Sequence, residues 1–272
     1  MSNGQLRDEE FIEEAIEIAD RAQRVNLPLR IMGACAIRLH CQTNVELHKV
    51  KMKRNITDLD FVTLRKHGSD AKEIFRELGY SAQIAMMGMD RDIYHNDRKG
   101  ITADVFFDKL DMCHTLFLTA RLQLDFPTIS LADLLLEKLQ VVKITEKDIK
   151  DIMVLVLEHE LGETNRETID SKYVAKLLAE DWGFYYTVTT NLNRIKDTSL
   201  NKYSNVLSKQ DLEKIQSKID QILSTVEKEP KSMKWKMRQK VGTKKIWYNE
   251  VEEKGRGTLA DYLMNKNVMK TN

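Results

Sequence analysis

The sequence contains few of the residues that mark secreted, membrane-spanning or loop-rich proteins. Cysteine occurs at only three of the 272 positions, too few and too scattered for a disulfide framework or a zinc site. The three prolines and eleven glycines predict few long loops. No apolar run approaches the roughly 18 residues that a membrane-spanning helix needs. The polar, acidic start of the chain does not resemble a signal peptide. We therefore expect a cytoplasmic protein with no membrane partner.

Net charge is also nearly absent. The 43 lysines and arginines balance 42 aspartates and glutamates, so the formal charge of +1 says nothing about partners. Any electrostatic signal must lie in local segments. Hydrophobic residues make up 42% of the chain, enough for a sizeable core, and 31% of the residues are charged, which is typical of a soluble, helix-rich protein.

Hydrophobic periodicity divides the chain into a mixed first half and a helical second half. In the first half we expect helices over 8–24, 34–40 and 69–79, strands over 27–32, 56–64, 81–87, 91–95, 101–107 and 113–119, a further short strand over 121–125, and a loop over 43–55. After Pro127 we expect helices over 130–142, 146–160, 170–181, 184–196 and 208–227. The fold class is therefore α+β, with a mixed sheet flanked by helices followed by a helical domain. We place the domains at 1–128, 129–230 and 231–272.

The last of these segments has a distinct composition. Seven basic residues and no acid lie between Lys231 and Lys245, with Trp235, Trp247 and Tyr248 interleaved or following. Two strands around Val241 would make it a short basic hairpin. Basic and aromatic residues together are typical of a surface that follows a nucleic-acid backbone and stacks on bases, so an RNA contact through 231–248 is one expectation. The alternative is that the aromatic side chains pack on the helical domain while the lysines face water.

The most informative segment is the predicted strand that contains Asp58 and Asp60. Side chains alternate along a strand, so these two carboxylates share one face and repel each other unless a cation lies between them. A divalent ion such as Mg²⁺, which prefers carboxylate, phosphate and water oxygens, would satisfy them. The alternative is that the pair simply lies on the solvent face of the strand.

Three neighbouring features favour the metal site. Asp104 is an isolated acid in the apolar run Ile101–Phe107, where an unpaired carboxylate would be costly. Asp108 and Asp111 are alternative acids, but they come at the end of that strand. An apolar strand ends at Gly33, where the following helix can offer backbone N–H groups to a phosphate. Two basic residues, Lys53 and Arg54, precede the acid pair.

In this order, the motifs resemble the nucleotidyltransferase superfamily of the DNA polymerase β type. The resemblance is closest to the AbiEii-like branch from abortive-infection toxin–antitoxin systems, and it covers roughly residues 25–160. It rests on a strand ending at Gly33-Ala34, the segment Arg54-x-x-Thr57-Asp58-x-Asp60, Asp104 on a later strand, Glu137-Lys138-Leu139, and Lys147-Asp148-Ile149-Lys150-Asp151. The sequence departs from the family pattern in two places: Ala34 replaces a serine, and a longer basic insert precedes Asp58.

The resemblance implies a metal-dependent transferase that moves an NMP from an NTP to a hydroxyl-bearing acceptor with two Mg²⁺ or Mn²⁺ ions. It implies Asp58, Asp60 and Asp104 as catalytic metal ligands. It also implies nucleotide-binding roles for a further set: Gly33, Ala34, Arg54, Thr57, Lys138, Asp148 and Asp151. The acceptor could be a small molecule, a tRNA or a protein. A phosphatase or nuclease could use the same acids, and a catalytically inert nucleic-acid-binding or regulatory protein could have the same fold.

Lys138 is also singled out by its position on its helix. It lies on the same face as Leu131, Leu134 and Leu135, so its charge must be compensated, must reach the helix edge, or must meet an anion. An NTP or its pyrophosphate is one such anion, and on this interpretation Lys138 is catalytic as well as nucleotide-binding. On this functional interpretation, replacing Lys138 with methionine should leave thermal stability unchanged or improved while NTP affinity or turnover falls sharply. The alternative is that the helix is apolar nearly all round and Lys138 merely reaches its edge, in which case the kinetics should not change.

Overall fold

A five-stranded mixed sheet lies at the centre of the first half of the chain. The computed structural model describes residues 7–83, 91–164 and 167–250. The strands are β1 (Arg30–Met32), β2 (Leu59–Thr63), β3 (Ser81–Ala82), β4 (Arg91–Asn96) and β5 (Ile101–Phe107). Their order across the sheet is β1-β2-β5-β4-β3, and β2 and β5 run parallel while the other neighbours run antiparallel. The predicted α+β class is confirmed.

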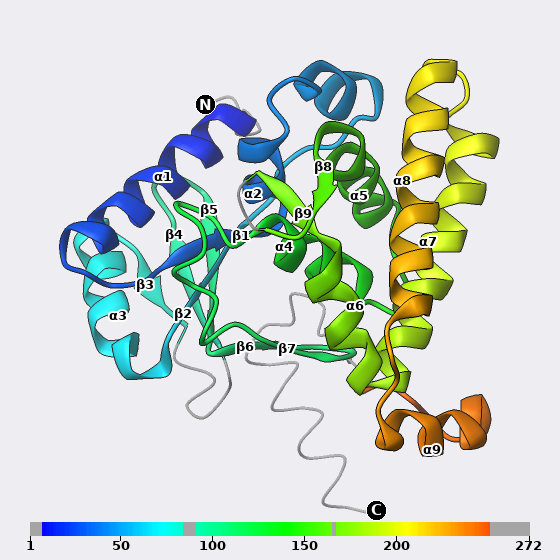
Figure 1. Cartoon of the computed structure of the whole chain (residues 1–272). Coiled ribbons are helices and arrows are strands. Elements are labelled where there is room, and N and C mark those ends of the chain that lie inside the picture. Colours follow the sequence, from blue (N-terminus) through cyan, green and yellow to red (C-terminus); the bar gives the residue numbers. More distant parts are fainter. Residues whose placement is uncertain (1–6, 84–90, 165–166, 251–272) are drawn as a thin grey trace, which may run out of the picture.

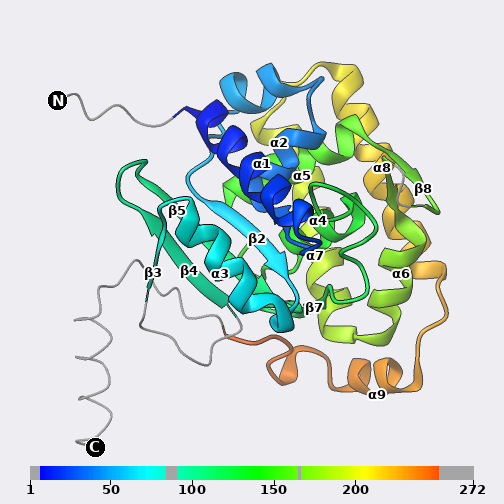
Figure 2. The same ribbon diagram turned by 90° about the vertical axis from the view of Figure 1, so that its left-hand side faces the viewer.

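Strand β5 shows why this sheet has two different faces. Its residues alternate between buried and half-buried, with Ala103 and Val105 inside the core and Thr102, Asp104 and Phe106 on the opposite face. Helices α1 (Asp8–Arg24) and α3 (Gly68–Glu77) lie side by side over one face of the sheet (Figure 2). The acidic face that carries Asp104 therefore lies away from these helices.

The connection to the second half is hydrogen-bonded to edge strand β1. The N–H of Ile31 donates to the carbonyl of Pro127 at 2.9 Å, and the N–H of Ile129 donates to the carbonyl of Ile31 at 3.1 Å. Helix α4 (Leu131–Leu139) begins directly afterwards, and Ser130 caps it by accepting a hydrogen bond from the N–H of Asp133. This pairing covers the sheet edge and fixes α4 against α2 (Gly33–His40).

The second half is helical, as predicted. After α4 come α5 (Glu146–Glu158), α6 (Ser171–Glu180), α7 (Trp182–Lys202) and α8 (Lys209–Lys228). Helices α7 and α8 run side by side at the edge of the molecule that lies away from the sheet (Figure 1). One hydrophobic core extends through both halves, and the division into domains stays a prediction. Among the described residues, no helix is both long and apolar enough to cross a membrane.

Several local expectations were wrong. The segment 43–55 is not merely a loop, because it contains a π-helical stretch, Glu46–Lys51, that buries His48. Residues 121–125 lie in turns, while Lys109–Asp111 (β6) and Thr115–Phe117 (β7) form a small hairpin. A parallel pair of short strands, β8 (Glu160–Gly162) and β9 (Thr168–Asp170), was not predicted. Residues 84–87 of one expected strand lie outside the described residues.

The basic segment after α8 is helical rather than a hairpin. Helix α9 (Met233–Val241) starts at Ser232, whose side chain accepts from the N–H of Trp235, and it ends at Gly242 with φ +58°. The expected turn is therefore a helix end. Trp235 is buried edge-to-face against Tyr185 of α7, so packing accounts for this aromatic residue. Residues 251–272 of the predicted tail lie outside the described part of the chain.

Candidate active site

Asp60 and Asp104 lie directly opposite each other on the two parallel strands β2 and β5. Opposed residues in neighbouring strands project from the same face, so both carboxylates lie on the side away from α1 and α3. Asp58 precedes β2 and is exposed. Burial, Asp58 and Glu137 together raise the pKa of Asp60 well above its usual value, against the opposing charge of Lys138. This face of the sheet therefore concentrates negative charge.

Asp104 has a partner of its own. Its Oδ2 accepts a hydrogen bond from the Arg91 guanidinium at 2.9 Å, and both side chains are partly exposed. Burial nevertheless raises the pKa of Asp104, and Asp58 adds to that effect against Arg91. In the described part of the chain, the three aspartates do not form a set whose donor atoms all lie within 4.8 Å of one another. For the three carboxylates to share an ion their donor atoms would have to move closer together, and Arg91 already holds one oxygen of Asp104.

Gly33 brings backbone directly against Asp60. It has φ +67°, which favours glycine, and a Cβ atom at this position would lie 2.3 Å from Oδ2 of Asp60. Its N–H donates to Oε2 of Glu137 at 3.1 Å, and Ala34 follows as a buried residue. The first N–H of α2 is therefore already occupied by a carboxylate, which a phosphate at this point would have to displace.

A second cluster of charges lies behind this site, centred on Asp151. The Asp151 side chain has no exposed surface and accepts two hydrogen bonds from Arg54, at 2.8 and 2.9 Å. His48 lies 2.9 Å from its Oδ1, and the Lys138 ammonium lies 3.7 Å from its Oδ2. Burial alone would raise the pKa of Asp151, but His48, Lys138 and Arg54 hold it below its usual value. Because its carboxylate is fully enclosed, Asp151 is placed to position these cations rather than to touch a nucleotide.

Lys138 connects the two clusters. Its ammonium lies 3.0 Å from Glu137 and 3.7 Å from Asp151, and its side chain is 11% exposed. Although burial opposes its charge, these two carboxylates hold the pKa of Lys138 above its usual value. Compensation by acids therefore accounts for a buried lysine at this position without any ligand.

The two remaining predicted residues lie at the margin of the site. The Thr57 hydroxyl donates to Oδ1 of Asp58 at 3.0 Å. Asp148 is in the first turn of α5, where its Oδ2 accepts from the N–H of Thr145 at 3.2 Å, and Thr145 in turn caps the helix. Its charge contributes to the environment of Arg54 and Lys138.

Four residues of this region were not predicted from the sequence as part of the site: Arg38, His48, Arg91 and Glu137. Arg38 links the clusters to the start of the chain, because it donates to Asp8 at 2.6 Å and to the carbonyl of Arg54 at 2.7 Å. Glu137 was part of the Glu-Lys-Leu motif, and its neighbour Lys138 was the available signal. His48 lay in a segment interpreted as a loop, so nothing marked it as buried.

Comparison with known proteins adds little to this geometry. No protein family model matches the chain, and no curated protein is similar to it. Among solved structures, the chain is similar to an antigenic nucleotidyltransferase-like protein from Paracoccidioides brasiliensis, with 14% sequence identity and a TM-score of 0.38, over 84% of this chain and 97% of that chain. A similarity this distant carries no functional argument, so function has to be inferred from the side chains.

Proposed function

We propose that this protein is a nucleotidyltransferase that moves an NMP from an NTP to a hydroxyl-bearing acceptor. The observation that carries the proposal is the opposed pair Asp60 and Asp104 on parallel strands, with the Gly33 backbone against the Asp60 carboxylate. The pKa of each aspartate is raised, which indicates that the local cations do not fully offset the burial and the negative charge. A bound cation would relieve this repulsion.

The donor set suits Mg²⁺ or Mn²⁺. Asp58, Asp60 and Asp104 offer only carboxylate oxygens, which these ions prefer, and Asp58 is exposed to a ligand arriving from solvent. Once bound, such ions stabilise charge on the phosphoryl group and on the attacking and leaving oxygens. Asp60 would hold them from β2, and Asp58 from the residue directly before that strand. Asp104, once released by Arg91, would face the acceptor hydroxyl and accept its proton.

The nucleotide would be held by the backbone and the cations around the aspartates. Gly33 and Ala34 offer the start of α2, and Thr57 offers a hydroxyl beside the acids. Arg54 and Lys138 supply positive charge, although both are already paired with Asp151. A triphosphate would therefore compete with Asp151 and Glu137 for these cations. In this proposal Asp151 and Asp148 keep the two cations in place between turnovers.

The finer assignment to an AbiEii-like toxin of the cytoplasm remains part of this proposal. The three buried free cysteines, Cys35, Cys41 and Cys113, are in keeping with a reducing compartment. The acceptor is left open between a small molecule, a tRNA and a protein hydroxyl.

A second candidate function is an inert protein of the same fold that binds RNA. The observation that favours it is the exposed basic side of α9, where Lys234, Lys236 and Lys240 face solvent. These lysines are compatible with an RNA acceptor as well, so the two functions differ in catalysis and not in RNA binding. Turnover of an NTP is what separates them.

The test is to incubate the protein with each α-labelled NTP, Mg²⁺ and cell extract, and to ask which molecule becomes labelled. Asp60→Asn keeps the shape of the side chain and removes its charge. We expect labelling to fall by at least on the order of 100-fold in this variant, the scale for losing a key electrostatic group. Its stability should hold or rise, because a repelled charge is removed.

The matched control is Asp220→Asn, which replaces an aspartate that is 58% exposed on α8. This variant should transfer label at the wild-type rate. In parallel, calorimetry should show NTP binding that EDTA largely abolishes. Full transfer by Asp60→Asn, or equal NTP affinity with and without metal, would contradict the proposal.

A further inference from the structure

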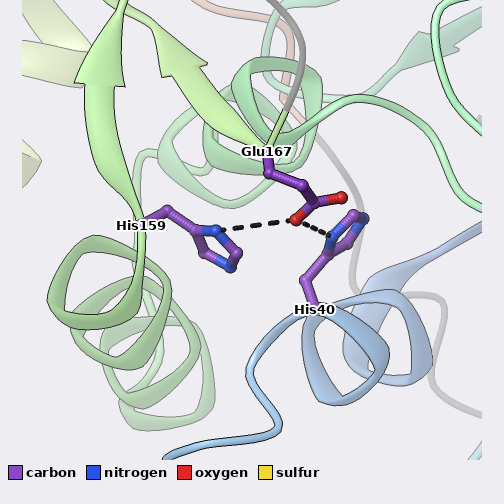
Figure 3. Close-up of side chains that lie close together, drawn as sticks. All are labelled: His40, His159 and Glu167. Atoms are coloured by element: carbon purple, nitrogen blue, oxygen red, sulfur yellow. Dashed lines mark ion pairs between the residues drawn. The ribbon is translucent and has the colours of Figure 1, made fainter.

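Two histidines and a glutamate from three separate segments converge at the far end of α2 from Gly33. His40 is the last residue of α2, His159 directly follows α5, and Glu167 directly precedes β9. Figure 3 shows the Glu167 carboxylate between the two imidazole rings. Within the described residues, this is the set of three donor side chains whose ligand atoms all lie within 4.8 Å of one another. None of the three belongs to the aspartate site.

The distances between the donor atoms suit one small metal ion. Oε2 of Glu167 lies 3.5 Å from Nδ1 of His40 and 3.9 Å from Nδ1 of His159. Ligands bound to Zn²⁺ at about 2.0–2.2 Å in a tetrahedron lie roughly 3.3–3.6 Å from one another. The two distances to Glu167 are therefore within a few tenths of an ångström of those across a tetrahedral face, and the two imidazole nitrogens lie within 4.8 Å of each other. Three such ligands leave a fourth tetrahedral position for water.

In metal sites, the ring nitrogen of histidine that does not bind the metal usually makes a hydrogen bond, and Nε2 of His40 is placed in this way. Its Nε2 lies 2.6 Å from the hydroxyl of Thr128 and 3.5 Å from Oδ2 of Asp125. A proton on Nε2 is shared with these oxygens, which leaves the lone pair on Nδ1 directed toward Glu167. The buried Thr128 and the partly buried Asp125 therefore hold the ring in the orientation that a metal ligand needs, with two oxygens placed to accept a proton on Nε2.

The ring of His159 likewise directs its Nδ1 toward Glu167. The His159 side chain is 8% exposed, and its Nε2 lies 4.0 Å from the sulfur of Cys41, so Nδ1 is again the nitrogen that faces Glu167.

We propose that His40, His159 and Glu167 form a binding site for a divalent transition metal, best suited to Zn²⁺. Imidazole nitrogens select transition metals over Mg²⁺ and Ca²⁺, and two imidazoles with one carboxylate are a donor set that zinc accepts with an open fourth position. The ion ties Glu167, which precedes β9, to the ends of α2 and α5. Because α2 begins at Gly33 beside Asp60, the ion also anchors the helix that leads into the aspartate site.

The alternative is an ion pair with no metal, in which a protonated His40 or His159 interacts with Glu167. Such an ion pair would stabilise the fold only slightly, because the Glu167 side chain is 70% exposed and surface ion pairs contribute about 0–1 kcal/mol. The two arrangements differ in a measurable way. An ion pair needs no metal and gives no saturable Zn²⁺ binding.

The experiment titrates Zn²⁺ into the full chain after metal removal with a chelator, by calorimetry. Co²⁺ serves as a second probe, because its visible absorption reports tetrahedral coordination. Glu167→Gln removes the exposed ligand without disturbing the core, and His159→Asn removes a second ligand. We expect one tight site per chain, and a loss in Zn²⁺ affinity in each variant that exceeds the roughly 10- to 100-fold typical of altering a residue behind a ligand.

Two controls assign the ion to this site. Glu163→Gln removes a carboxylate that is 74% exposed in the same segment, and it should bind Zn²⁺ and Co²⁺ as the wild type does. An Asp58→Asn/Asp60→Asn double variant removes the competing aspartate site and should keep the Zn²⁺ site. Absence of saturable Zn²⁺ binding, or equal affinity in wild type and Glu167→Gln, would overturn the inference.

Discussion

Asp60, which is half-buried, and Asp151, which is fully buried, carry the same side chain, yet their pKa values move in opposite directions. The pKa of Asp60 is raised by burial and by the acids Asp58 and Glu137. The pKa of Asp151 is held low because Arg54, His48 and Lys138 surround it and outweigh the effect of its burial. The sign of the shift is therefore set by the neighbours and not by depth alone.

The difference is that the charge of Asp151 is balanced by nearby cations, whereas the charge of Asp60 is not. Asp151 has all the cations it needs, so its network serves to hold α4, α5 and the segment before β2 together near the site. Asp60 has acids around it, and Lys138, the cation that opposes them most, is also engaged by other carboxylates. A charge that the fold itself leaves unbalanced is what a bound cation can satisfy.

The largest effect on the free energy of unfolding is expected from replacing Asp151, the aspartate whose charge is balanced by neighbouring cations. Asp151→Asn leaves Arg54 and Lys138 buried without their shared carboxylate. Breaking a buried ion pair by removing one partner costs about 3–5 kcal/mol, so the free energy of unfolding should fall by that order. Urea unfolding measures it, with Asp220→Asn as the exposed control. A decrease below about 1 kcal/mol, the scale of a surface ion pair, would show that the Asp151 network is not structural.

A smaller but still substantial effect is expected for Lys138→Met. On sequence alone this change should leave stability unchanged, but the structure pairs Lys138 with Glu137 and Asp151. Asp151 keeps Arg54 and His48 in the variant, so we expect a decrease of about 1–3 kcal/mol, the cost of leaving a buried polar group unsatisfied. Thermal unfolding measures this. NTP affinity or turnover should fall as well, and unchanged kinetics would limit Lys138 to the structural role.

The raised pKa of Asp60 also predicts how the stability of Asp60→Asn relative to wild type depends on pH. A carboxyl group with a raised pKa in the folded state favours folding when protonated, so its contribution is lost as pH rises through that pKa. The stability advantage of Asp60→Asn over wild type should therefore shrink on acidification, by at most about 1.4 kcal/mol per pH unit. Urea titrations between neutral pH and pH 4 measure it. A constant advantage would show that the pKa of Asp60 is not raised.

The contribution of Asp151 to stability should change with pH in the opposite direction. Its pKa is depressed below the ordinary value of 3.8, so its contribution is present above that value and lost as pH falls toward the folded-state pKa. Wild type should therefore lose its advantage over Asp151→Asn only below about pH 3.8. An advantage that disappears between pH 7 and pH 5 would contradict this assignment.

The smallest expected effect lies far from both aspartates, on α9. Replacing Lys234, Lys236 and Lys240 with glutamine should weaken RNA binding and reduce its salt slope by about one for each phosphate that a lysine no longer neutralises. Filter binding at several salt concentrations measures both. Substitution is preferable to truncation, because Trp235 is buried and Arg238 lies 5.0 Å over the Trp182 ring. Unchanged binding would leave these lysines as a solvated surface.

Long amphipathic helices and the fold class could be predicted from the sequence, because their apolar spacing repeats over many residues. Helix α1 occupies the predicted range 8–24, and Ser130 caps α4 at the expected start. Short elements could not be predicted in this way, because they contain too few residues for a period to be recognised. The pair β8 and β9 has three residues in each strand, and α9 was interpreted as a hairpin because its lysines and tryptophan carry no clear period.

Asp60 and Asp104 stand out in the sequence because aspartate is disfavoured inside an apolar strand, and their role as metal ligands stays a prediction. Their opposed register and the Gly33 contact required the fold. The pairing of the buried His48 with Asp151 joins residues 103 positions apart, which no local pattern reveals. The set of His40, His159 and Glu167 went unrecognised for the same reason, since its spacing in sequence resembles no metal-binding motif.

Asp8, the first residue of α1, is bound to the segment that leads to the aspartates. Its carboxylate accepts from Arg38 at 2.6 Å and from the N–H of Ile56 at 3.1 Å, and Arg38 in turn holds the carbonyl of Arg54. Loss of the Asp8 carboxylate would leave a buried guanidinium without its acid and loosen the segment that leads to Asp58. The start of α1 is thus tied, through one carboxylate and one guanidinium, to the segment that carries Asp58.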